Sequence, residues 1–385
     1  MVNIANVLLR CVARTTLLIN KGIPLNNFIH IFFIYVLWLF INCIYMNKCE
    51  KGLILNRYTV LFGAIILAIK TKSYLLFYIF FELRILPVII IIFLFGYQPE
   101  KLNASLSLVL YTAFGRLPLL IYILYFGMNF TNLFVSIPMT LCFMVKTPIY
   151  LLHIWLPKAH VEAPVGGSIV LAGALLKLGS YGLLLFLPLI KLNLYLRFLW
   201  AISVVGSVVC SLICFRQGDL KLLIAYSSIV HIGVITLGFV RATELGYSCG
   251  IIIIIRHGLR SPFLFAFAFW LYESSHSRLM ANNAFMWPVM IAGFFTLISI
   301  NRRLPPSLGV WAEIFIVMRV VNVIEVGFLF LVLIFFLGLL YNIYLYVTCI
   351  HAKFNNISGK IHLFPVIQVV LISFSSPFIL DVYHI

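Results

Sequence analysis

Acidic residues are scarce in this chain of 385 residues, which holds 10 aspartates and glutamates against 27 lysines and arginines. Charged residues of both signs make up only 10% of the sequence, while apolar residues make up 64%. A soluble domain of this size could not hide that much apolar surface. The scarcity of charge therefore excludes an ordinary soluble enzyme and indicates a membrane protein.

Recognisable catalytic and metal-binding motifs are also missing. The sequence has no G-x-S-x-G nucleophile motif, no phosphate-binding glycine loop and no dinucleotide-binding fingerprint. No two histidines have the H-x-x-x-H or H-E-x-x-H spacing of zinc enzymes. The eight cysteines form no C-x-x-C pair, so we expect small apolar residues rather than ligands of zinc or an iron–sulfur cluster. We therefore expect neither a metal nor a cofactor in this chain.

Long apolar runs are what the sequence does contain. Each is roughly 18–22 residues long, enough to cross about 30 Å of hydrocarbon as a helix. The runs are continuous rather than alternating, which favours helices over a transmembrane barrel. We predict an all-α, polytopic membrane helix bundle with about 13 transmembrane helices. The expected spans are residues 28–46, 53–70, 73–95, 104–126, 136–156, 164–188, 197–215, 221–240, 245–271, 284–301, 307–324, 326–350 and 362–380.

The net charge of +17 does not indicate a nucleic-acid partner. The basic residues lie mostly at the ends of apolar runs, where lysine and arginine anchor helices, and no basic patch with interleaved aromatics occurs. Lysine and arginine are nearly balanced between alternate loops, so the orientation in the membrane stays open. Residues 1–27 are consistent with a transit peptide or with a short first helix at the membrane edge, and we favour the helix.

Two lysines lie inside apolar sequence. Lys146 and Lys177 have apolar residues on both sides, and an ionisable residue within a span is costly and indicates a functional site. Pro148 and Pro157 predict a discontinuous helix after Lys146, with free carbonyl groups and access for water. Small residues around Lys177, such as Gly179, allow close helix packing. We expect both lysines at similar depth on adjacent helices.

Glu82, in the segment FYIFFELRILPVIIIIF, is the natural partner of Lys146. A buried charge needs an opposite charge nearby, and the pair would act as a proton switch when it opens and closes. A helix-packing ion pair is the alternative. His153 would link the two lysines through water.

Other ionisable residues could extend this route. His231 and His257 suit a proton relay, although a lone histidine on an apolar face is as consistent with a core residue. Glu313 follows the Pro305–Pro306 pair and would be the last charged residue of the proton route. This proline-interrupted span with a buried charge is similar to the one at Lys146. Two such spans in corresponding positions indicate an inverted repeat. The loop residues Lys158, His160 and Glu162 are expected to cap helices or line an entrance.

Several motifs occur in a fixed order: LPKAHVEAPVGGS, LLKLGSYG, RQGDLKLLIAYSSIVHIG, HGLRS, YESSHSR and LPPSLGVWAE. Together they resemble the chain 4 family of NADH–ubiquinone oxidoreductase (respiratory complex I), the mitochondrially encoded antiporter-like subunits. The resemblance extends over residues 75–350 and is carried most specifically by LPKAHVEAP followed by LLKLG-x-YG.

The resemblance implies an antiporter-like fold of two inverted repeats, each with a discontinuous helix. We divide the chain into residues 1–72 (N-terminal helices, shorter than is usual in that family), 73–190 and 191–350 (the two repeats), and 351–385 (a C-terminal helix). The resemblance also implies that protons pass through Glu82, Lys146, Lys177, His231, His257 and Glu313.

The same resemblance implies a multi-pass place in the mitochondrial inner membrane and a part in the H⁺-translocating NADH:ubiquinone reductase reaction, without redox chemistry in this chain. FMN, iron–sulfur clusters and ubiquinone would lie in other subunits. The expected partners are other membrane-arm subunits, especially the antiporter-like chains 2 and 5, and lipids such as cardiolipin. The alternatives are a free-standing cation/proton antiporter and a structural membrane scaffold with vestigial charges.

Four arginines interrupt apolar sequence where members of that family usually carry small or hydroxyl residues. An unpaired arginine within a span costs at least about 2.5 kcal/mol on insertion scales. We hypothesise that these positions are serine in the natural chain, because many invertebrate mitochondria read the codons AGA and AGG as serine. The positions are Arg84, Arg116, Arg260 and Arg319.

Overall fold

The computed structural model describes residues 25–46, 52–71, 73–96, 99–125, 133–187, 193–240, 244–280, 288–301, 312–314, 316 and 325–351. This part of the chain is almost entirely helical. The first helices are α2 (Leu25–Met46), α3 (Leu53–Lys70), α4 (Tyr74–Leu83), α5 (Ile85–Phe95), α6 (Lys101–Tyr125), α7 (Leu133–Lys146) and α8 (Trp155–Glu162). They are followed by α9 (Val165–Val170), the π-helix η2 (Leu171–Leu175), α10 (Leu176–Phe186), α11 (Asn193–Cys214), α12 (Leu220–Val240), α13 (Glu244–Ser275), α14 (Pro288–Asn301) and α16 (Glu325–His351).

The predicted all-α, polytopic membrane bundle is confirmed. Among the described residues, 7 helices are long and apolar enough to cross a membrane. Most of the expected spans coincide with described helices. The expected span at 307–324 is described only at residues 312–314 and 316, and the one at 362–380 lies outside the described residues. The division into repeats stays a prediction.

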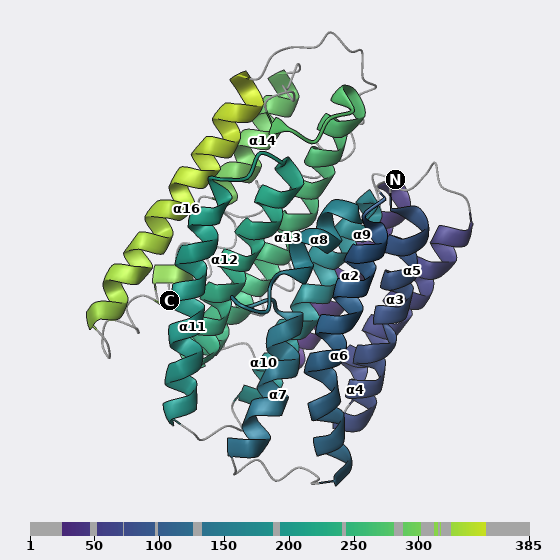
Figure 1. The fold of residues 1–385 in the computed structure, drawn as a ribbon, viewed down its shortest axis with the longest axis vertical. Helices are drawn as coiled ribbons and strands as arrows, with labels where there is room; N and C mark the ends of the chain where they lie inside the picture. The colour runs from purple at the N-terminus through teal and green to yellow at the C-terminus, as the bar shows by residue number, and fades with distance from the viewer. Residues whose placement is uncertain are drawn as a thin grey trace.

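The helices form an elongated bundle. Figure 1 shows α3 to α6 on one side and α11, α14 and α16 on the other. Between them, α12 and α13 pack against α8 and α9, which joins the two sides. Side chains from the first half of the chain, on α8 and α9, therefore meet side chains from the second half at α12 and α13.

Burial differs sharply between the central and the outer helices. In α12, 94% of the most apolar window is buried, against 28% in α16. Outer helices expose large apolar side chains such as Leu110 on α6 and Leu329 on α16. A helix that is apolar all round is either a core helix or a membrane span, and these outer faces suit lipid or partner subunits.

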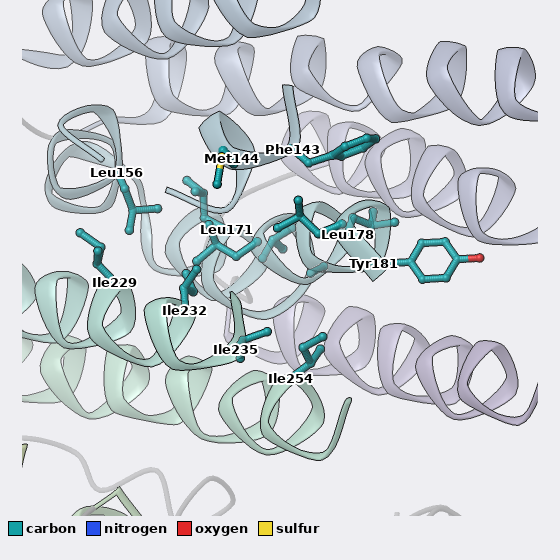
Figure 2. Packing of buried hydrophobic residues seen from close by; sticks show 14 of the residues in the cluster. Phe143, Met144, Leu156, Leu171, Leu178, Tyr181, Ile229, Ile232, Ile235 and Ile254 are labelled. Carbon is teal, nitrogen blue, oxygen red and sulfur yellow. The ribbon is translucent and has the colours of Figure 1, made fainter. Parts of the chain in front are cut away.

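The core around the lysines is built from η2, α10 and their neighbours. Figure 2 shows Leu171 and Leu178 packed between Phe143 and Met144 of α7 and the isoleucines of α12. All of these side chains belong to one cluster of buried residues that extends through most of the bundle. The two lysine-bearing segments are thus fixed by continuous apolar packing.

The predicted discontinuity after Lys146 is present. α7 ends at Lys146, and no regular helix resumes before α8 begins at Trp155. Within the break, Leu151 adopts a φ of 78°, a backbone conformation that non-glycine residues rarely adopt and that costs energy. The Trp155 indole Nε1 donates to the Val145 carbonyl at 2.9 Å, which satisfies a carbonyl at the end of α7. Pro157 lies in the first turn of α8 rather than in the break, a position that tolerates proline.

Glycines set the close approach of α7 and α10. A Cβ atom at Gly179 would lie 2.8 Å from Thr147 Cγ2 and 3.1 Å from Lys146 Cβ. One turn further on, a Cβ atom at Gly182 would lie 2.2 Å from the Phe143 ring. The predicted role of small residues is therefore confirmed at this contact, which places the Lys146 and Lys177 segments on neighbouring helices.

Substituting Gly182→Ala should destabilise the protein, because the new methyl group overlaps a ring held in the core. We expect a loss of about 1–3 kcal/mol, the usual cost of overpacking. The measurement is the midpoint temperature of thermal unfolding of the purified protein. Gly63→Ala is the matched control, since a Cβ atom at this position of α3 meets nothing within 4 Å. Equal temperatures for the two variants would contradict the close contact.

Candidate functional site

Glu82, near the end of α4, is shared between two cations. Lys146 Nζ lies 3.4 Å from Glu82 Oε1 and donates a hydrogen bond to Oε2 at 3.5 Å. Arg116 Nη1, from α6, lies 3.3 Å from the same Oε2. The structure thus brings together the predicted Glu82–Lys146 pair and adds a second cation. The Lys146 side chain is almost fully buried, while that of Arg116 is one-third exposed.

A small cavity extends from Lys146 toward η2. Its volume is about 30 Å³, the size of a water molecule, and its lining is mainly apolar, with Lys146, Arg84 and Thr112 among the lining residues. Leu171 and Leu175 of η2 also line it. The cavity therefore lies beside Lys146 and against η2, the segment that directly precedes the helix of Lys177.

Lys177 is held by its own helix and by a histidine. Its ammonium group donates to the Ala172 carbonyl, which lies in η2, and Nζ lies 2.7 Å from His257 Nδ1 on α13. π-Helical segments often mark functional sites, and here the segment supplies a carbonyl to a buried cation. Lys177 is 2% exposed, so these groups take the place of water.

Tyr35 of α2 ties the same region together. Its hydroxyl lies 2.9 Å from the Gly173 carbonyl in η2 and 2.7 Å from the Gly258 carbonyl in α13. A Cβ atom at either glycine would lie 2.9 Å from that hydroxyl, so both positions need a residue without a side chain. The tyrosine therefore links the two helices beside the Lys177–His257 contact.

The predicted histidines are brought together. The rings of His231 on α12 and His257 have centroids 5.4 Å apart. His231 Nε2 lies 3.0 Å from Asn301 Oδ1 on α14, and Asn301 Nδ2 donates to Asn342 Oδ1 on α16 at 2.5 Å. Sequence reasoning missed both asparagines. The available signal was an amide inside an apolar run, which is costly in a membrane unless it is hydrogen-bonded.

Glu313 is also buried, and its carboxylate lies near α13. Arg256 Nη1 lies 3.9 Å from Glu313 Oε1, and Arg256 directly precedes His257 in sequence. Sequence reasoning did not single out Arg256. The Pro305–Pro306 pair lies outside the described residues, so the second discontinuous helix stays a prediction.

The structure corrects the expected positions of the supporting residues. Lys158, His160 and Glu162 lie on α8 rather than in a loop, because the apolar side chains of this short helix are buried in the bundle. Only Lys158 is exposed. His160 is fully buried and stacks on Phe265 with centroids 4.4 Å apart.

Two further contacts lie close to these residues. The carbonyl of Ala163, next to Glu162, accepts a hydrogen bond from Lys221 at 3.4 Å. His153 lies in the break and contacts the Tyr150 and Tyr226 rings. Within the described residues, the ring contacts of His153 involve neither Lys146 nor Lys177. The predicted link between the two lysines through His153 therefore has no direct contact to support it.

Metal binding finds no support in the part of the chain that the structure describes. No group of three or more histidine, cysteine, aspartate or glutamate residues could hold an ion there. The six cysteines in that part are buried, which suits small apolar residues.

The unusual arginines occupy different surroundings. Arg84 lies in the turn between α4 and α5, is 1% exposed, and donates to the carbonyls of Phe81 and Leu175. Arg116 binds Glu82, and Arg260 is buried on α13. Arg319 lies outside the described residues. The serine hypothesis stays a prediction at all four positions.

Comparison with known proteins places these features in a family. Residues 71–340 match the model of the family described as "NADH:quinone oxidoreductase/Mrp antiporter, TM". The chain is 38% identical over 321 residues to NADH-ubiquinone oxidoreductase chain 4 of Ceratitis capitata, covering 79% of this chain and 72% of the relative. It is 34% identical over 386 residues to the chain of the same name from Rhipicephalus sanguineus, covering 92% of this chain and 88% of the relative.

A solved structure has a similar fold. It is described as respiratory complex I from Thermus thermophilus with bound NADH. The TM-score is 0.81 at 20% identity, covering 91% of this chain and 81% of the matched chain. At this identity the likeness shows the fold alone.

The serine hypothesis makes a prediction about the chain isolated from its source. Trypsin cleaves after arginine but not after serine, so peptides should run uncut through positions 84, 116, 260 and 319, with fragment masses that give serine at each. Arg57, on the exposed face of α3, is the internal control for cleavage. Cleavage after Arg84 or Arg116, or fragment masses that give arginine there, would contradict the hypothesis.

Proposed function

The chain belongs to the NADH:quinone oxidoreductase/Mrp antiporter membrane family, and we propose that it works as a proton-translocating subunit in the membrane arm of NADH:ubiquinone oxidoreductase. Relatives named as chain 4 of that enzyme match most of its length, which supports this assignment. As such a subunit it takes part in H⁺-translocating NADH:ubiquinone reduction.

One observation carries the proposal more than any other. Two contacts between ionisable side chains lie in the buried interior on adjacent helices, one between Glu82 and Lys146 and the other between Lys177 and His257. Membrane proteins place such residues along proton pathways, because a buried charge without a function would be costly. A core stabilised only by packing would not need two buried lysines on adjacent helices.

The first step is an exchange of partners at Glu82. While the carboxylate lies beside Lys146, it stabilises the ammonium form. When the carboxylate moves away, Lys146 releases its proton through water in the adjoining cavity toward Lys177. The energy comes from quinone reduction in another part of the complex, which shifts the balance between the closed and open pair.

The second step passes the proton out of the lysine region. Lys177 and His257 are within hydrogen-bond distance at 2.7 Å, so the proton can move directly between their nitrogens. Glu313, paired with Arg256 next to His257 in sequence, then receives it for release to the aqueous side. In this proposal His153, in the break after α7, and Lys158, His160 and Glu162, on α8, are supporting residues.

Redox chemistry belongs elsewhere in this proposal. FMN, iron–sulfur clusters and ubiquinone lie in other subunits, and this chain carries no redox cofactor. The exposed apolar faces of α6 and α16 would contact other membrane-arm subunits, especially the antiporter-like chains 2 and 5, or lipids such as cardiolipin. The chain is a multi-pass membrane protein, and we place it in the mitochondrial inner membrane.

Two other functions fit the observations less well. A free-standing cation/proton antiporter would need several oxygen ligands for Na⁺, whereas the Glu82 carboxylate already faces the Lys146 ammonium group. A structural scaffold with vestigial charges would not require the lysines to be held by an acid, a helix carbonyl and a histidine.

Removing either central lysine should stop most proton transfer. In the assembled complex reconstituted into vesicles, we expect Lys146→Met and Lys177→Met each to lower NADH-driven proton uptake by at least about tenfold, since a positioned acid–base group contributes a factor of this size or more. Lys70→Met at the exposed end of α3 is the matched control and should change little.

The alternatives predict different outcomes. Unchanged pumping in both lysine variants, with normal assembly, would favour the scaffold. Proton uptake that depends on Na⁺ in the unmodified complex would favour the antiporter.

A further inference from the structure

The hydroxyl of Tyr35 on α2 lies between two backbone carbonyls that belong to different helices. It is 2.7 Å from the carbonyl of Gly258 in α13 and 2.9 Å from that of Gly173 in η2. The residue before Gly258 is His257, and the residue before Gly173 is Ala172. These two preceding residues supply the ring nitrogen and the carbonyl that bind the buried lysine of α10. One hydroxyl group therefore lies next to both partners of that lysine.

The Gly258 carbonyl lacks the N–H group that normally pairs with it. In an α-helix a carbonyl accepts from the N–H four residues further on, and here that residue is Pro262, which has no N–H. A carbonyl left unpaired in a buried, apolar place costs about 1–3 kcal/mol. The Tyr35 hydroxyl therefore supplies the donor that the proline removes.

The π-helical turn also leaves a carbonyl without a backbone donor. The Leu176 N–H donates to the Leu171 carbonyl five residues back, and α10 returns to the four-residue pattern from its N-cap onward. The two N–H groups of residues 177 and 178 are then left for the three carbonyls of residues 172–174. One of these carbonyls needs a donor from a side chain, and Tyr35 lies within hydrogen-bond distance of the carbonyl at residue 173.

The chemistry of the hydroxyl limits what Tyr35 can do. A hydroxyl has one hydrogen, so it donates to only one of the two carbonyls at a time. The Gly258 carbonyl is the closer acceptor and has no helix N–H, so it is the preferred one. Carbonyl groups have no hydrogen to give, which means that Tyr35 cannot pass a proton along this contact. Its contribution is to hold the backbone in place.

The ring of Tyr35 is held by packing that does not depend on its hydroxyl. The residue is 6% exposed, and its ring stacks on those of Phe32 and Trp38 with centroids 6.0 and 6.2 Å away. Trp38 in turn packs edge-on against Phe263 of α13, at 5.3 Å. Removing the hydroxyl alone would therefore leave α2 packed against α13.

We propose that Tyr35 is a positioning residue for the Lys177–His257 contact. Its hydroxyl pairs with the carbonyl that Pro262 leaves without a donor, which fixes the backbone next to the histidine. Without the hydroxyl, this part of α13 shifts until the Gly258 carbonyl finds another donor, and the adjoining histidine leaves its 2.7 Å contact with Lys177. This inference rests on the proposed function of the relay.

The first test removes only the hydroxyl. In the assembled complex in vesicles, Tyr35→Phe should lower NADH-driven proton uptake by at least about tenfold, because displacing a reacting group by about 1 Å can cost about 100-fold. Tyr111→Phe, at a half-buried position of α6, is the matched control and should change little.

A second substitution supplies the missing donor from the helix itself. Pro262→Ala places an N–H four residues after Gly258, so the double variant Tyr35→Phe/Pro262→Ala should recover proton uptake to within about threefold of the unmodified complex. A tyrosine that acted only by filling space would not be rescued in this way. If Tyr35→Phe alone does not assemble, assembly of the double variant supports the inference, and its failure to assemble overturns it.

Infrared spectra of the complex with isotope-labelled glycine carbonyls test the hydrogen bond separately from pumping. A carbonyl stretching band moves to higher frequency when a hydrogen bond is lost. We expect such a shift in Tyr35→Phe relative to the unmodified complex, and its reversal in the double variant. Coincident spectra of the single and double variants, or proton uptake in Tyr35→Phe within about twofold of the unmodified complex, would overturn the inference.

The outcomes also separate this inference from the proposed function. Loss of pumping in Lys177→Met together with normal pumping in Tyr35→Phe would remove only the role of the tyrosine. Normal pumping in Lys177→Met would remove the relay on which that role depends.

Discussion

A cation buried in a membrane protein must be neutralised or solvated by the protein itself, and the arrangement around Lys146 and Lys177 follows from this requirement. The two lysines are accommodated differently. Lys146 faces the Glu82 carboxylate and the Phe81 ring, with its Nζ atom 5.0 Å from the ring centroid. Lys177 has a carbonyl of its own helix and the His257 ring. Lys146 thus depends on a partner that can move away, while Lys177 has partners built into rigid helices.

The irregular backbone is what makes these surroundings possible. The break after α7 ends the helix at Lys146, and the strained Leu151 shows that neighbouring structure holds the break in place. The π-helical turn η2 presents the Ala172 and Gly173 carbonyls to side chains from elsewhere in the bundle. Gly179 lets α10 approach α7 closely. Each irregularity serves a polar contact, so this region cannot be regular helix throughout.

The sequence predicted the fold class and the charged pair because both have strong physical signals. Apolar runs of membrane length predict spans, and a lone glutamate in such a run needs a cation, which made Lys146 its partner. The π-helix carries no comparable signal, since its residues, Leu171–Leu175, are ordinary helix formers. Asn301 was overlooked because a single neutral amide stands out little until its partners are known. The helical position of His160 depended on how α8 packs, which local polarity did not indicate.

The central claim is that a continuous, hydrated polar route joins Lys146 to Lys177. The most direct measurement is a map of the assembled membrane arm at a resolution that shows ordered water. Our account predicts water density in the cavity beside Lys146, continuing past Leu171 and Leu175 to the ammonium group of Lys177. A dry, apolar barrier between the two lysines in every resolved state of the complex would contradict it.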